Sequence, residues 1–306
     1  MSRLWMLLSA LLCAAPALAD TYRNCGKDWR AAAPSRIVTL NQHAADLVLA
    51  LGAGPALVGV AYLDDTAAGQ RPSEYFGVPV IARQYPASEV LYAQKPDLVI
   101  GGFATAFGDG VTSRSGLARN GVGSYLLESA CNGHSLDYFA HVRNDLLTLG
   151  KLLHKQPQAR QLSEAMDADL ASARALAGAG EPLSVFYLDS EVKGLDSEGR
   201  RGFASPLLAA AGARNVFADI NLYRVTVNSE TLLASDPDVI LLADAEWSTA
   251  RRKRYLLTHD PVLSQLRAVR ENRIIEIPFT HLLPTFNSGR VALELARQLN
   301  ALKKNK

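Results

Sequence analysis

The sequence predicts an α/β protein of two similar lobes, each with a parallel sheet, joined by a long helix. Three observations support this fold class. The chain of 306 residues is long enough for two cores of about 130 residues each. Short apolar runs typical of buried strands alternate with segments of helical periodicity. Finally, a segment of the first half recurs in the second half.

The recurring segment carries an acidic residue at the same place in each half. Residues 88–100 and 229–241 both begin Ser-Glu, continue as a short amphipathic helix, stop at Pro-Asp and end in an apolar strand. Chance similarity between two helix-strand units is the alternative interpretation. We expect Glu89 and Glu230 to be equivalent exposed carboxylates that form a two-point docking surface, with a ligand cleft between the lobes.

A targeting segment precedes the first lobe. Arg3 supplies positive charge, residues 4–15 form a short apolar core, and residues 17–19 (Ala-Leu-Ala) form a small-residue cleavage site. Residues 1–19 are therefore predicted to be a secretory signal peptide, and the periplasm is the expected location. No later stretch reaches 18 uninterrupted apolar residues, so we expect the mature chain to be soluble.

Charge and cysteine content narrow the function further. The chain has 32 basic and 30 acidic residues, which does not indicate nucleic acid. We expect the basic run at 251–254 to lie on a solvated helix face. Cys25 and Cys131 are the pair left after cleavage and predict a structural disulfide in an oxidising compartment. Because Cys25 precedes the first predicted strand, losing the bridge should lower stability without abolishing ligand binding.

The first lobe is predicted to span residues 20–135. Its predicted elements are a strand at 36–40, a helix at 44–51, and strands at 56–61, 98–101 and 123–127. Ligands on parallel sheets bind beyond the carboxyl ends of the strands. The candidate ligand-binding residues at these ends are Asn41, Gln42, His43, Tyr62, Tyr85 and Phe103.

Residues 136–178 are predicted to connect the lobes. A helix at 138–153 is followed by a second at 157–176, which starts at Pro157, a residue well suited to the first helical position. Twenty helical residues span about 30 Å. We therefore expect a stiff, helical hinge.

The second lobe, residues 179–306, repeats the plan of the first. We predict a strand at 183–188, a long polar loop at 189–202, helices at 206–211 and around Glu230, strands at 239–243 and 273–277, and a closing helix at 288–302. Candidate ligand-binding residues are Tyr187, Arg200, Arg201, Phe203, Tyr223, Arg224, Trp247 and His281. Arginines and aromatic rings together suit a bulky anionic or aromatic ligand.

From about residue 36 to the C-terminus, the chain resembles the periplasmic substrate-binding proteins of ferric-siderophore and cobalamin ABC importers. The resemblance is carried by the two repeated segments and by residues 36–42 (RIVTLNQ), 49–52 (LALG), 58–60 (VGV) and 206–212 (PLLAAAG). It implies two Rossmann-like lobes joined by one long helix, a ligand in a shallow cleft, and surface glutamates, here Glu89 and Glu230, that meet arginines of an inner-membrane permease.

The resemblance leaves the ligand open. We expect a ferric siderophore or related iron complex, with cobalamin second and haem third, bound by a monomer that has no resident cofactor and no metal site of its own. His43 departs from the more usual Asn-Gln-Ser turn. His43 and His281 follow strands on opposite lobes and are interpreted as ligands of one metal atom, as hydrogen-bonding residues, or as rim residues without such a role.

Two other classes of function explain the sequence less well. The chain contains no Gly-x-Ser-x-Gly elbow, no phosphate-binding Gly-x4-Gly-Lys-Ser/Thr loop and no His-Glu-x2-His motif. An enzyme is therefore not expected. A purely structural protein would leave Glu89, Glu230 and the aromatic and arginine-rich rim unexplained.

Overall fold

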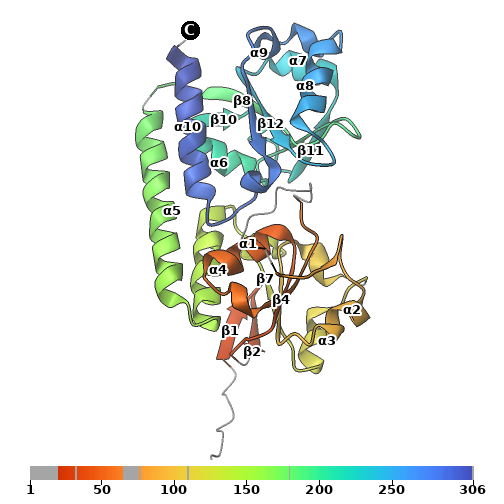
Figure 1. Ribbon diagram of the computed structural model, residues 1–306. Helices are drawn as coiled ribbons and strands as arrows, with labels where there is room; N and C mark the ends of the chain where they lie inside the picture. Colours follow the sequence, from red (N-terminus) through yellow and green to blue (C-terminus); the bar gives the residue numbers. More distant parts are fainter. Residues whose placement is uncertain are drawn as a thin grey trace, which may run out of the picture.

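The computed structural model describes residues 20–31, 33–64, 75, 77–108, 110–178 and 180–304. Figure 1 shows two lobes with the long helix α5 (Gln156–Ala177) running along the side of both. Each lobe contains a parallel sheet, which confirms the predicted fold class. The predicted signal peptide at 1–19 lies outside the described residues.

The first lobe is built on a five-stranded parallel sheet in the order β5-β4-β3-β6-β7. In chain order its strands are β3 (Ile37–Leu40), β4 (Leu57–Ala61), β5 (Val80–Ala82), β6 (Leu98–Gly101) and β7 (Gly123–Leu126). Its helices are α1 (Gln42–Ala50), α2 (Ser88–Ala93) and α3 (Arg114–Arg119), with 3-10 turns η1 (Gly54–Ala56), η3 (Ala104–Phe107) and η4 (Glu128–Ala130). The central strands are buried throughout, as their apolar runs predict.

An N-terminal hairpin lies beside this sheet and was not predicted. It consists of β1 (Asp20–Asn24) and β2 (Lys27–Ala31), paired antiparallel. Cys25 lies in the turn of this hairpin and is bonded to Cys131. The disulfide is therefore present, but the expectation that Cys25 precedes the first strand is wrong. Polar residues dominate both strands, so hydrophobic alternation gave no signal for them.

The second lobe has a four-stranded parallel sheet in the order β10-β8-β12-β13. Its strands are β8 (Leu183–Leu188), β10 (Ala213–Asn215), β12 (Val239–Asp244) and β13 (Ile274–Pro278). Its helices are α6 (Ala204–Ala210), α7 (Ser229–Ser235), α8 (Ala250–His259) and α9 (Arg267–Arg270), with 3-10 turns η5 (Leu263–Gln265) and η6 (Phe279–Leu282).

The segment expected to be a long polar loop, residues 189–202, contains a strand instead. Strand β9 (Leu195–Glu198) pairs antiparallel with β11 (Arg224–Val227). Leu195 and Ser197 are buried, while the two residues that alternate with them are partly exposed. The pairing partner lies far away in the sequence, and a strand held by such a partner is not visible from local composition.

The repeat found in the sequence is also a structural repeat. The Asp97 carboxylate accepts hydrogen bonds from the backbone N–H (2.8 Å) and hydroxyl (2.9 Å) of Ser35, just before β3. The Asp238 carboxylate accepts the same two bonds from Ser184 of β8, at 2.9 and 3.0 Å. In each lobe, the Asp of the Pro-Asp pair therefore fixes the start of the neighbouring strand.

Two further helices complete the connection between the lobes. Helix α4 (Tyr138–Leu152) packs on the first half of α5, and α10 (Ser288–Lys304) packs along α5 from the second lobe. A Cβ atom on Gly289 would collide with the backbone of Met166, so these helices approach closely. The predicted helical connection is confirmed. None of the helices in the described part combines the length and apolar character that crossing a bilayer requires.

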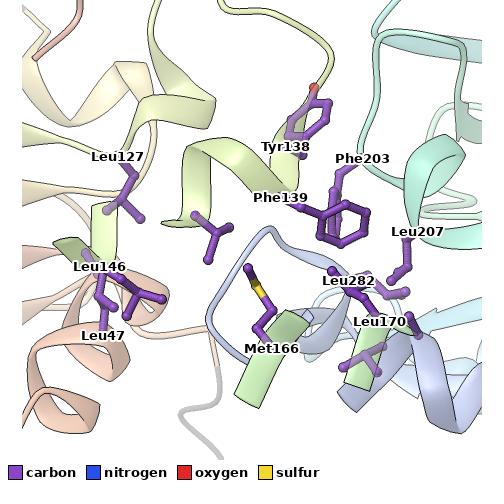
Figure 2. Packing of buried hydrophobic residues seen from close by; sticks show 14 of the residues in the cluster. Leu47, Leu127, Tyr138, Phe139, Leu146, Met166, Leu170, Phe203, Leu207 and Leu282 are labelled. Carbon is purple, nitrogen blue, oxygen red and sulfur yellow. The ribbon is translucent and has the colours of Figure 1, made fainter. Parts of the chain in front are cut away.

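One hydrophobic core continues from the first lobe through the connecting helices into the second. Figure 2 shows part of it around α4 and α5. The labelled side chains are Leu47, Leu127, Tyr138, Phe139, Leu146, Met166, Leu170, Phe203, Leu207 and Leu282. Because this core crosses the junction, packing as well as helix stiffness fixes the orientation of the two lobes.

The basic run at 251–254 departs from the expectation of a solvated face at one position. Arg251 and Arg252 are exposed, but Lys253 is fully buried on the inner face of α8. Its Nζ donates hydrogen bonds to the backbone carbonyls of Ala243 and Ser248, the latter at 3.0 Å. Helical periodicity turns this one residue of the run toward the sheet.

Candidate functional site

A hollow of about 410 Å³ lies between the lobes, beyond the carboxyl ends of both parallel sheets. This inter-lobe hollow falls within the size range of small-molecule sites. From the first lobe it is lined by His43, Gly102, Phe103, Ala104 and the consecutive residues 129–134, here called the cleft wall. The remaining lining residues are Tyr138 of α4 and, from the second lobe, Glu198, Arg201, Phe203, Tyr223, Leu282, Leu283 and Pro284.

Asn41 organises the first-lobe side of this hollow. It is fully buried, and its Oδ1 accepts hydrogen bonds from the backbone N–H groups of Gly102 (3.0 Å) and Phe103 (3.2 Å). Its φ of 136° is unusual for a residue other than glycine. Asn41 thus ties the end of β3 to the end of β6. Gln42 plays a similar part, since its Oε1 accepts from the backbone N–H of Asp64 at 2.8 Å.

His43 forms the floor of the inter-lobe hollow. The residue is 3% exposed, and its ring centroid lies 4.6 Å from that of Phe103. Burial lowers the pKa of His43 to about 4, so the imidazole is neutral at neutral pH. Its Nδ1 has no hydrogen-bond partner among the described residues. A Cβ atom on Gly102 would collide with the imidazole, so the ring fits because residue 102 is a glycine.

Tyr138 of α4 and the polar side chains of Glu198, Arg201 and Tyr223 from the second lobe also line the hollow. The Tyr138 hydroxyl donates to the backbone carbonyl of Arg201. Glu198 Oε2 accepts from the Ala204 backbone N–H at 2.8 Å, and burial raises the pKa of this carboxyl to about 7. The guanidinium of Arg201 is exposed and forms no ion pair within the described part of the chain. The second lobe therefore presents a cation beside aromatic hydroxyls.

A second hollow of about 690 Å³ also joins the lobes and is lined by Tyr62, Leu63, Asp64, Arg83, Gln84, Glu246 and Trp247. Tyr62 and Tyr85 meet edge to face, with ring centroids 4.9 Å apart. The Tyr85 hydroxyl is 2.8 Å from Thr105 Oγ1. Trp247 is 46% exposed and packs against Phe279 at 4.9 Å.

The remaining candidates lie elsewhere. Tyr187 is buried in the core, where its hydroxyl donates to Asp189 at 3.0 Å. Arg224 pairs with the same aspartate at 2.9 Å. Arg200 is exposed but does not line the inter-lobe hollow. His281 lines a third hollow, of about 450 Å³, against α1. His43 and His281 therefore line different hollows.

No metal centre is evident in the described part of the chain. No three or more histidine, cysteine, aspartate or glutamate side chains are grouped there in a way that could hold a metal ion. The docking candidates are placed as the repeat predicts: Glu89 and Glu230 are exposed, each in the first turn of its helix, α2 and α7 respectively.

Several lining residues were missed by sequence reasoning. Arg83 follows β5, a strand of three residues that is too short to be recognised in the sequence. Because ligands bind beyond the carboxyl ends of parallel strands, recognising β5 would have made Arg83 a candidate. Glu198 and Tyr138 belong to a strand and a helix that reach the hollow through tertiary packing alone. The cleft wall contains Cys131, whose pairing was predicted but whose position at the hollow was not.

The chain is similar to known proteins in both sequence and structure. The family model described as periplasmic binding protein matches residues 37–280. No curated protein matches the chain. A periplasmic binding protein from Veillonella parvula has a similar structure, with a TM-score of 0.79 and 21% identity over 93% of this chain and 98% of that chain.

Two further solved structures are somewhat closer in sequence. One is described as an ABC-type Fe3+-hydroxamate transport system from Saccharomonospora viridis. It is 26% identical, with a TM-score of 0.75 over 93% of this chain and 99% of that one. The other is a periplasmic heme-binding protein from Roseiflexus in apo form, 25% identical, with a TM-score of 0.70 over 88% and 98%.

Proposed function

The chain belongs to the periplasmic binding protein family of ABC importers, and we propose that it captures a ferric siderophore and delivers it to an inner-membrane permease. Membership of a binding-protein family implies a location outside the cytoplasm; we propose the periplasm. The proposed action is binding and delivery by a monomer, without catalysis.

The main observation behind an anionic chelate is the state of Arg201. Its guanidinium lines the inter-lobe hollow without an ion-pair partner among the described residues, whereas Arg224, Arg254 and Arg267 of the same lobe each pair with a carboxylate. A guanidinium held at a cleft is suited to bind a ligand carboxylate or other oxyanion through charge-assisted hydrogen bonds. The aromatic side chains of Tyr223 and Phe103 add flat surfaces on which a bulky chelate can pack.

The relative described as an Fe3+-hydroxamate transport system favours an iron chelate as the ligand. Haem is the second candidate. It is favoured by the heme-binding relative and by the neutral imidazole of His43 in the lining of the hollow. No observation on the described residues specifically favours cobalamin.

The proposal is tested by titrating the purified mature protein with a ferric trihydroxamate, hemin and cyanocobalamin. We expect the ferric chelate to bind most tightly. Replacing Arg200 and Arg201 together by Ala should weaken its binding by about 2 kcal/mol or more, because charge-assisted hydrogen bonds are lost. Most of this loss should come from Arg201→Ala, since Arg200 lies outside the hollow.

Arg30→Ala serves as the control, because Arg30 is exposed at the far end of the first lobe. Unchanged affinity in the double variant would contradict an anionic ligand at Arg201. His43→Ala separates the candidate ligands further. Direct ligation of iron or haem iron predicts a shift in the visible absorbance of the bound chelate, whereas a hydrogen bond from His43 leaves the spectrum in place.

A further inference from the structure

The cleft wall, residues 129–134, forms one continuous side of the inter-lobe hollow. Its backbone N–H groups bond to residues only three positions away: Ala130 to Leu127 at 2.9 Å, Cys131 to Glu128 at 3.1 Å, and His134 to Cys131 at 3.3 Å. Bonds of this kind shape a turn but do not fix it against the rest of the lobe, although the last residue of the wall, His134, packs its ring against Tyr138 and His141 of α4. The Cys131 disulfide, by contrast, links the wall to a residue 106 positions away.

The partner cysteine lies at a turn that local sequence preference does not favour. Cys25 and Gly26 connect β1 to β2 with φ values of 51° and 75°, the arrangement of a two-residue type I′ turn. The first position of such a turn normally holds Asn, Asp or Gly, and another residue with positive φ costs about 1 kcal/mol. The turn places the Cys25 side chain against the cleft wall, at a Cα–Cα distance of 5.2 Å from Cys131.

The hairpin that carries Cys25 is itself fixed to the sheet by two side chains of β1. The Tyr22 hydroxyl donates to the Ser124 carbonyl at 2.6 Å and accepts from the Ser124 N–H at 3.2 Å. The Asn24 amide bonds to the carbonyl and N–H of Leu126 at 2.9 and 3.0 Å. Tyr22 and Asn24 are alternate residues and therefore point to the same side. Their polar atoms form hydrogen bonds with the backbone N–H and C=O groups of β7, as the backbone of a neighbouring strand would.

From this geometry we propose that the β1–β2 hairpin acts as a strap. Through the Cys25–Cys131 disulfide it holds the cleft wall in its ligand-binding position, so that ligand affinity depends on the disulfide. The dependence of affinity rests on the proposed function, whereas the restraint on the wall does not. The sequence alone suggested a bridge remote from the ligand because Cys25 is remote, but Cys131 lines the hollow.

The physical reason is preorganisation. A wall that is already ordered in the free protein loses little conformational entropy when ligand binds, whereas a released wall must be ordered at the expense of affinity. The strap is joined to β7, the edge strand of the sheet from which the wall emerges. The sheet is therefore connected to the wall by the chain itself and to the hairpin by hydrogen bonds, and the disulfide connects the hairpin to the wall.

The first test needs no ligand. Amide hydrogen exchange is measured on oxidised protein, on Cys25→Ser and on wild type after mild reduction. In the Cys25→Ser variant, Cys131 remains in place as part of the lining. We expect exchange in residues 129–134 to accelerate about tenfold or more in both disulfide-free forms, because the wall opens locally. Unaltered exchange in the wall would overturn the proposal.

Two variants separate a local restraint from general destabilisation. Tyr22→Phe removes the hydroxyl bonds between β1 and β7 but keeps the disulfide and the Asn24 anchor, so exchange in the wall should accelerate less than it does in Cys25→Ser. Leu266→Ala creates a cavity in the buried cluster of the second lobe and lowers stability without touching the strap. If Leu266→Ala accelerates amide exchange in the cleft wall as much as Cys25→Ser does, the strap does not restrain the wall.

The second test measures affinity for a ferric trihydroxamate and for hemin. Whichever chelate wild type binds, the Cys25→Ser variant should bind it about tenfold more weakly. Leu266→Ala should retain wild-type affinity at temperatures where it is folded. Equal affinity of Cys25→Ser and wild type would refute the link to binding. If wild type binds neither chelate, the proposed function fails, and hydrogen exchange alone still decides whether the strap restrains the wall.

Discussion

Lys253 is buried, although the basic residues around it in the sequence are typical of a solvated helix face. It belongs to a run of four basic residues, yet it is fully buried and donates to the carbonyls of Ala243 and Ser248. Burial lowers its pKa, while the nearby carboxylates of Asp189, Glu191 and Asp244 act in the opposite direction. Its ammonium group closes the 244–249 loop, which carries Trp247 to the second inter-lobe hollow.

We predict that Lys253→Met lowers the free energy of unfolding by about 3–5 kcal/mol. The substitution leaves the buried carbonyls of Ala243 and Ser248 without their donor, at about 1–3 kcal/mol for each unsatisfied group, and it removes the positive charge that the nearby carboxylates stabilise. The measurement is urea denaturation followed by circular dichroism. Arg251→Met is the matched control, since it removes an exposed charge from the same helix and should change stability by less than about 0.5 kcal/mol. A similar small effect for Lys253→Met would mean that its charge is not needed.

At the scale of elements, α2 and α7 are the repeated unit that faces outward. Each is short, begins with Ser-Glu, and is followed by the Pro-Asp pair whose aspartate anchors the adjacent strand. The glutamates occupy the first turn, where the helix dipole favours negative charge. Neither glutamate lines the inter-lobe hollow. The arrangement supports a role in contact with a partner rather than with the ligand.

We predict that Glu89→Arg and Glu230→Arg each reduce uptake of the bound chelate, and that the double variant reduces it most. The proposed docking role pairs these glutamates with arginines of the permease, so reversing their charge would replace attraction by repulsion. Transport into proteoliposomes is measured together with ligand titration, which should be unchanged. Glu164→Arg, an exposed change on α5, is the control. Full uptake by the double variant would refute the docking role, and parallel loss of ligand binding would assign these residues to the fold.

At the scale of the whole molecule, the connecting helix α4 and the second lobe each contain a buried acid whose ionisation the fold disfavours. Burial raises the pKa of Asp145 on α4 from 3.8 to about 8, although its carboxylate accepts from the Tyr125 hydroxyl at 2.8 Å. Burial likewise raises the pKa of Glu198 from 4.5 to about 7. The folded state therefore binds more protons than the unfolded state between the unfolded and the folded pKa of each acid, so stability falls as pH rises across that interval and levels off above the folded pKa.

We predict that stability decreases between about pH 6.5 and pH 8 and levels off above that, because both acids are then ionised in the folded state as well. His43 contributes with the opposite sign, but only below its unfolded value of 6.5, because its folded pKa is lowered to about 4. The measurement is the melting temperature as a function of pH. Asp145→Asn should flatten the curve up to about pH 8, and Glu198→Gln should flatten it below about pH 7. A wild-type curve that rises from pH 6.5 to 8 would contradict these assignments.

The sequence determined the features that depend on neighbouring residues. Apolar runs located β3, β6, β8 and β12, since a fully buried strand must be apolar on both faces. The repeated Ser-Glu and Pro-Asp segments located two equivalent helices, and compartment and cysteine count identified the disulfide pair. Among the candidates chosen because they follow predicted strands, His43, Phe103 and Trp247 line the two inter-lobe hollows, since strand ends can be read from strand positions.

Tertiary structure decided everything that depends on residues far apart in the chain. Strand β9 exists because β11 pairs with it, and the N-terminal hairpin is held by polar side chains that mimic a strand edge. Packing also sent Lys253 inward, placed His43 and His281 in different hollows, and brought Cys131 to the cleft. Local periodicity records which face of an element is buried, but not which distant element covers that face, and the position of each side chain at the cleft depends on that contact.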